Sequence, residues 1–197
     1  MTAREPSTFS VITPATFGAR QRLGFRLALG LTGLRVALAG PLLALAVARG
    51  PGGAVAAVLV IGFLSDVYDG VIARRFDAVT PDLRRLDSTA DTIFYLAVAI
   101  CLWRLDRAAV ASNAWMIAVV FSTQAINHLI EFLKFRKEAS YHAWSAKAWG
   151  LGLFIATVVL FATGNSTLLP FALAIGLGSH AENFAITMIL PHWEHDV

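Results

Sequence analysis

The sequence predicts an all-α integral membrane protein, a bundle of six transmembrane helices with a short N-terminal interfacial helix. Of its 197 residues, 57% are hydrophobic and only 15% are charged, whereas about 25% of a typical soluble domain is charged. The mean hydropathy is +0.65, and the apolar residues gather in six runs. This composition argues against a soluble enzyme, a disordered protein and a nucleic-acid-binding domain.

Each apolar run has the length of a membrane-crossing helix. In order, the runs occupy residues 28–48, 54–73, 88–103, 108–133, 148–163 and 168–190. They are too long for strands and do not alternate with a period of two. Thr80 and Pro81 are expected to cap and begin the third helix. No room is left for a separate soluble domain, so we expect one domain over 1–197, with the spans in 28–190.

The segment before the first run differs from the runs. Residues 1–27 include Arg20, Arg22 and Arg26 among apolar side chains. Such a segment favours a short helix lying in the membrane interface.

Lys and Arg predict the orientation. Twelve lie in the N-terminus and in the loops that follow the second and fourth runs, and only Arg49, Arg104 and Arg107 lie on the opposite side. By the positive-inside rule, both termini face the cytoplasm. We expect a bacterial-type inner or plasma membrane.

An acidic cluster is the most informative local feature. Asp66 and Asp69 share a face of the second predicted helix, and Asp87 and Asp91 share a face of the third. Four carboxylates near a membrane interior repel one another unless a cation lies between them. Hard divalent cations with oxygen ligands meet this need. We expect Mg²⁺, with Mn²⁺ as the alternative and two ions as the number, in a phosphoryl-transfer site at the cytoplasmic face.

The aspartates also allow other interpretations. Asp77, Asp82 and Asp106 are interpreted as solvated residues at helix ends. A membrane metal or proton transporter that uses the cluster as a relay is an alternative function. It is disfavoured because the cluster lies near one face and no polar path continues across the bilayer.

The spacing of these residues resembles the signature of a known family. Asp66-x-x-Asp69-Gly70-x-x-Ala73-Arg74, followed by Leu83-x-x-x-Asp87-x-x-x-Asp91, is similar to the motif of the CDP-alcohol phosphotransferases. The resemblance implies a six-helix membrane bundle, usually a homodimer. It also implies transfer of a phosphatidyl or similar group from a CDP-alcohol to a second alcohol, with release of CMP.

The resemblance assigns roles to the motif residues. Asp66, Asp69, Asp87 and Asp91 would be metal ligands, with Asp91 also the general base. The implied nucleotide-binding residues are Asp66, Gly70, Ala73, Arg74 and Leu83. Gly70 would let the cytidine diphosphate approach the backbone, Ala73 would keep the pocket open, and Arg74 would pair with a phosphate.

One position departs from the pattern. The family has a glycine where this chain has Leu83, so this side chain is expected to narrow the cytidine pocket. A catalytically impaired homologue that only binds nucleotide is therefore a further alternative. All four aspartates are present, which favours an active enzyme.

Three further basic residues are candidates to bind phosphate on the acceptor or donor. Thr32-x-x-Arg35 in the first run resembles another family feature. An arginine at this depth either lines the site or snorkels to the interface. Lys147 and Arg136 lie in the basic loop before the fifth run, where their charges would also suit contact with anionic lipid.

These observations lead to one functional expectation. The chain would act in phospholipid biosynthesis, with CDP-diacylglycerol as donor and a small polar alcohol as acceptor. Glycerol 3-phosphate and an inositol phosphate are the acceptors we expect. The expected partners are membrane lipids and a second copy of the chain, with no nucleic acid.

Overall fold

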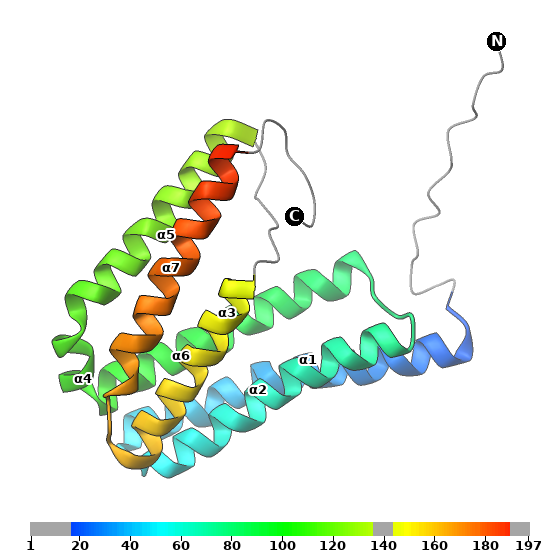
Figure 1. Ribbon diagram of the computed structural model, residues 1–197. Coiled ribbons are helices and arrows are strands. Elements are labelled where there is room, and N and C mark those ends of the chain that lie inside the picture. The colour runs from blue at the N-terminus through cyan, green and yellow to red at the C-terminus, as the bar shows by residue number, and fades with distance from the viewer. Residues whose placement is uncertain (1–16, 136–143, 190–197) are drawn as a thin grey trace. The chain divides into compact units, whose positions relative to one another are not determined.

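The computed structural model describes residues 17–135 and 144–189, which form seven helices and no strand. The helices are α1 (Ala19–Ala48), α2 (Gly52–Arg75), α3 (Pro81–Leu105), α4 (Arg107–Ser112), α5 (Ala114–Phe135), α6 (Trp144–Thr163) and α7 (Leu168–Ile189) (Figure 1). The prediction of an all-α protein is therefore confirmed.

Five of the helices are long and apolar enough to cross a membrane: α1, α2, α3, α5 and α6. Only 17% to 33% of the residues in their most apolar stretches are buried within the protein. Most of their side chains therefore point outward, as contact with lipid requires. The prediction of an integral membrane protein rests on these five helices.

The sixth predicted span corresponds to α7, which is not among the five. It has 22 residues, enough to cross about 30 Å of hydrocarbon. Its second half carries His180, Glu182 and Asn183, which lower its hydropathy. The count of six spans is therefore not confirmed.

The separate interfacial helix is also not confirmed, because residues 19–26 form the first turns of the continuous helix α1.

The predicted run 108–133 is interrupted at Asn113, which separates α4 from α5. The side-chain amide of Asn113 donates to the carbonyl of Ala109 at 2.9 Å. The carbonyl of Asn113 accepts from the N–H of Ile117 at 3.0 Å and so begins α5. Asparagine favours helix ends because its side chain competes for backbone hydrogen bonds, and hydropathy alone does not register this effect.

The chain divides into two compact units. Among the described residues, the first contains 17–44 and 60–99, and the second contains 45–59, 100–135 and 144–189. The acidic motif lies entirely in the first unit, together with most of α1 and α3.

Small residues allow the helices of the first unit to approach closely. Ala28 of α1, Ala73 of α2 and Leu83 of α3 form a buried cluster. A Cβ on Gly62 of α2 would overlap the ring of Phe94 of α3, which is only 1% exposed. Glycine at this position therefore sets how closely α2 and α3 pack.

The N-terminus of α3 forms as the sequence predicts. Pro81 is its first residue, and the hydroxyl of Thr80 accepts a hydrogen bond from the N–H of Leu83 at 3.1 Å. This cap satisfies one of the otherwise unpaired N–H groups of the first turn. It begins the helix that carries Asp87 and Asp91.

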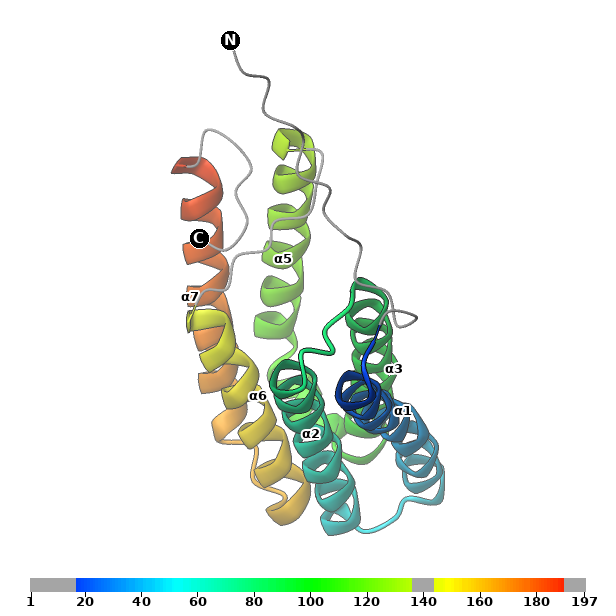
Figure 2. The ribbon, with the colours of Figure 1, turned by 90° about the vertical axis from the view of Figure 1, so that its right-hand side faces the viewer.

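In the second unit, α7 packs against both α5 and α6 (Figure 2). Val120 of α5 meets Leu169 and Leu173 of α7 in an apolar cluster. Nearer the other end of α7, the amide of Asn127 donates to the carbonyl of His180 at 2.9 Å. Apolar packing and polar contacts thus both join α5 to α7.

Candidate functional site

The four aspartates of the motif converge on Arg35, within the first unit. Nη1 of Arg35 lies 3.2 Å from Oδ1 of Asp66 and 3.0 Å from Oδ1 of Asp87. The same nitrogen also pairs with Asp91, and Nη2 pairs with Asp69. Three helices therefore contribute to one cluster: α1 supplies the cation, and α2 and α3 supply two carboxylates each.

The cluster is closed on one side and open on the other. The side chain of Arg35 is 1% exposed and that of Asp69 is 6% exposed, whereas the side chains of Asp66, Asp87 and Asp91 are 34% to 37% exposed. Thr32 donates its hydroxyl to Oδ2 of Asp69 at 3.2 Å. The guanidinium of Arg35 is therefore buried against the carboxylates and is not exposed at the protein surface.

The carboxylate oxygens are suitable ligands for a divalent cation. Asp66, Asp69 and Asp87 each offer an oxygen, and these atoms lie within 4.8 Å of one another. Arg35 balances the charge of only one carboxylate. At this separation the remaining charges repel by roughly 3 kcal/mol per pair at an effective dielectric constant of about 20. The all-oxygen donor set and its excess negative charge fit a hard divalent ion.

The remaining motif residues lie near the end of α2 and the start of α3. Arg74 is exposed, and its guanidinium lies over Gly70, where an added Cβ would be 3.2 Å from Nη1. Within the residues that the structure describes, Arg74 forms no salt bridge, so its charge is available to an anion. Ala73 and Leu83 are both buried at 6% exposure and pack in one cluster.

The structure describes only one of the two basic candidates that precede the fifth predicted span. Lys147 belongs to the second unit, is exposed, and places Nζ 4.8 Å from the ring centroid of Trp144. Arg136 lies outside the described residues.

Sequence reasoning missed two contacts of this site. It did not identify Arg35 as the common partner of all four aspartates, or Thr32 as a donor to Asp69. A signal for both was present, because residues three apart in a helix share a face. An arginine within an apolar span also requires a nearby acid, and the neighbouring predicted helices carried four.

Comparison with known proteins agrees with the motif. The profile of the CDP-alcohol phosphatidyltransferase family matches residues 25–188, which include every residue of the cluster. No curated protein and no solved structure matched the chain.

Proposed function

Because the chain belongs to the CDP-alcohol phosphatidyltransferase family, we propose that it transfers a phosphatidyl group from CDP-diacylglycerol to a polar alcohol and releases CMP. Glycerol 3-phosphate and an inositol phosphate are the proposed acceptors. The observation that carries this proposal is the convergence of four aspartates on one buried arginine. A cluster of this kind suits a reaction that moves a phosphoryl centre between two oxygens.

Asp91 is the proposed general base. It takes the proton of the acceptor hydroxyl, whose oxygen forms a bond to the β-phosphorus of the donor. The bond from that phosphorus to the bridging oxygen breaks, and CMP leaves with the electron pair. The side chain of Asp91 is 34% exposed, so a hydroxyl can come within hydrogen-bond distance, as general-base catalysis requires.

Asp66, Asp69, Asp87 and Asp91 are the proposed ligands of Mg²⁺, with Mn²⁺ as the alternative and two ions as the proposed number. Bound divalent ions supply charge neutralisation to a diphosphate. Both terminal nitrogens of Arg35 already pair with carboxylates of the cluster. We therefore assign Arg35 to positioning the aspartates and not to holding a phosphate of the acceptor.

The nucleotide is proposed to bind beside Gly70 and Ala73. The exposed guanidinium of Arg74 can turn away from Gly70 toward a donor phosphate, because arginine forms paired hydrogen bonds with phosphate oxygens. Leu83 packs beside Ala73. We propose that its side chain narrows the pocket for the cytidine. Lys147 and Arg136 are the proposed contacts for a second phosphate on the acceptor.

The proposal includes a homodimer in an inner or plasma membrane, with the aspartates on the cytoplasmic side. Exposed apolar side chains on all five apolar helices support contact with lipid and with a second copy. The excess of Lys and Arg on one predicted side supports the orientation.

The test is CMP release by purified protein supplied with CDP-diacylglycerol and Mg²⁺. A panel of glycerol 3-phosphate, inositol 1-phosphate, inositol and serine identifies the acceptor. Asp91→Asn should reduce the rate about 10²- to 10⁴-fold, the usual contribution of a general base. Asp82→Asn is the matched control, because this carboxylate is exposed in the first turn of α3 and outside the cluster.

Equal background rates in the wild-type protein and Asp91→Asn would reject the catalytic proposal. Metal flux into liposomes without any CDP-alcohol would support the transporter instead.

A further inference from the structure

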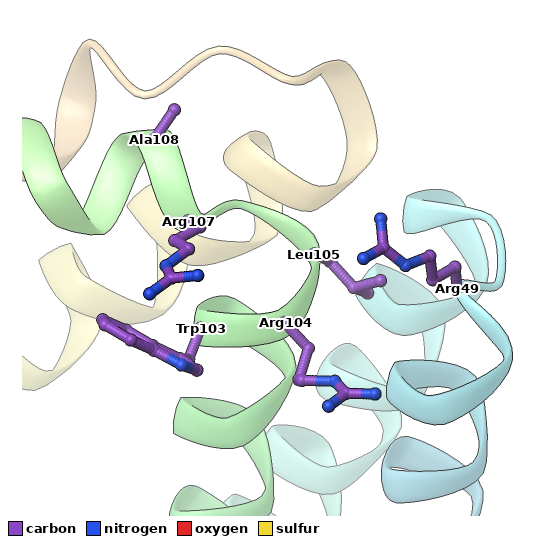
Figure 3. Close-up of a pocket in the computed structure, with 6 residues that line it drawn as sticks. All are labelled: Arg49, Trp103, Arg104, Leu105, Arg107 and Ala108. Carbon is purple, nitrogen blue, oxygen red and sulfur yellow. The ribbon is translucent and has the colours of Figure 1, made fainter.

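Three arginines line one cavity in the second unit, away from the acidic motif in sequence. Arg49, Arg104 and Arg107 line an open cavity of about 520 Å³, together with Trp103, Leu105 and Ala108 (Figure 3). Arg49 follows α1, Arg104 lies in the last turn of α3, and Arg107 begins α4. Three separate places in the chain thus bring guanidinium groups to one cavity.

These charges have no acidic partner in the part of the chain that the structure describes. Within residues 17–135 and 144–189, none of the three guanidiniums forms a salt bridge or a side-chain hydrogen bond. Arg107 lies 4.8 Å from the ring centroid of Trp103, a cation–π contact that leaves its N–H groups available (Figure 3). Arginine stays protonated in proteins, so the three like charges repel one another and an anion would stabilise them.

The backbone at Arg49 adds a second observation. Its φ is +49°, a left-handed conformation that glycine or asparagine adopts at lower cost. The N–H of Gly50 donates to the carbonyl of Leu45 at 2.8 Å and closes the end of α1 around it. A long charged side chain thus occupies a position where a smaller residue would fit the backbone better.

We propose that this cavity binds the phosphate of an anionic ligand, either the phosphodiester of a lipid headgroup or free phosphate. Guanidinium groups match phosphate with paired hydrogen bonds, and the volume lies within the range of small-ligand pockets. Trp103 and Ile100 are exposed three residues apart on α3, and an exposed tryptophan at a helix end is typical of headgroup depth. These features favour the lipid source.

The three arginines are separated from the acidic motif along the chain. Along α3, Arg104 follows Asp91 by 13 residues, which is about 20 Å of helix. The positive-inside rule places the arginines on the side opposite the cytoplasm. The proposal therefore does not depend on the CMP-releasing reaction.

Binding is tested with the full chain in a neutral detergent. Phosphatidylglycerol, phosphatidylcholine and inorganic phosphate are titrated separately, and tryptophan fluorescence and the unfolding midpoint are measured. Arg49→Asn combined with Arg104→Gln should weaken phosphatidylglycerol binding at least about 100-fold, or about tenfold per arginine. Asparagine suits the left-handed backbone, so the first change removes charge without adding strain. Arg26→Gln is the control, because Arg26 is exposed on α1 and does not line the cavity.

Each outcome bears on the proposal. Phosphatidylglycerol binding that exceeds phosphatidylcholine binding and is lost in the double variant supports a lipid ligand. Inorganic phosphate that binds as tightly as phosphatidylglycerol, and is lost in the same variant, supports free phosphate. The proposal is overturned if the wild-type protein and the double variant bind phosphatidylglycerol with equal affinity and also bind inorganic phosphate with equal affinity. If the double variant does not fold, Arg107→Gln alone decides between the same outcomes.

Discussion

Nη1 of Arg35 in α1 lies 3.0 Å from Oδ1 of Asp87 in α3, although 52 residues separate the two in the chain. The same guanidinium pairs with Asp66 and Asp69 of α2. One buried cation therefore links three helices at the point where the carboxylates gather. The arrangement of the site depends on this ion-pair network as well as on apolar packing.

Replacing Arg35 with methionine should lower the free energy of unfolding by about 3–5 kcal/mol, because it leaves the buried carboxylate of Asp69 and three half-buried carboxylates without their cation. Mg²⁺ should restore more of the unfolding midpoint in this variant than it adds to the wild-type protein, since a bound ion replaces the missing charge. The measurement is thermal unfolding in EDTA and in Mg²⁺. Arg26→Met, an exposed change on the same helix, is the control. Equal responses to Mg²⁺ in the variant and the wild-type protein would contradict the role given to Arg35.

Removal of divalent ions should abolish CMP release and destabilise the folded protein. A ligand that binds only the folded state at 100 times its dissociation constant adds about 2.7 kcal/mol. Asp66→Asn should reduce this gain, because Asp66 is one of three carboxylates whose oxygens lie within 4.8 Å of one another. Asp82→Asn should keep the full gain. If EDTA leaves both the rate and the unfolding midpoint unchanged, the cluster does not hold a required ion.

Much of this architecture could be predicted from the sequence, because spacing within a helix determines which residues share a face. The pairs Asp66 and Asp69, and Asp87 and Asp91, needed only helical periodicity. The cap at Thr80 needed only local side-chain chemistry, and the structure confirms it.

Features that depend on one particular hydrogen bond or on distant packing could not be predicted. The break at Asn113 depends on an amide that reaches the carbonyl of Ala109, whereas hydropathy shows one continuous run. The need of Arg35 for an acidic partner could be predicted from its place in an apolar run, but the contact of one guanidinium with all four aspartates depends on how α1 packs against α2 and α3. The cavity lined by Arg49, Arg104 and Arg107 could not be predicted from the sequence. The positive-inside rule counts these residues only to assign the orientation, and it does not show that they lie close together.

Replacing Leu83 with glycine should destabilise the protein and widen the proposed nucleotide pocket. Leu83 is 6% exposed and packs with Ala28 and Ala73, so losing its side chain should cost about 2–5 kcal/mol. We expect a lower unfolding midpoint together with a lower KM for CDP-diacylglycerol. Leu83→Ala is the control that separates the lost side chain from the added backbone freedom of glycine. A wild-type protein with no turnover that gains activity in Leu83→Gly would instead support the impaired homologue.

Replacing Asp106 with asparagine should stabilise the protein near neutral pH. Asp106 lies between α3 and α4, and burial raises the pKa of its carboxyl above the usual value. A carboxyl whose folded pKa exceeds its unfolded pKa of about 3.9 costs stability when ionised, and the cost disappears as the pH falls below the unfolded value. The substitution removes no cap, because the side chain of Asp106 makes no capping hydrogen bond and asparagine is an equally good N-cap. Thermal unfolding between pH 8 and pH 4 should therefore show an advantage for Asp106→Asn that shrinks as the pH falls. If the carboxylate instead forms ion pairs with Arg104 or Arg107 in solution, the variant will be the less stable protein at pH 8.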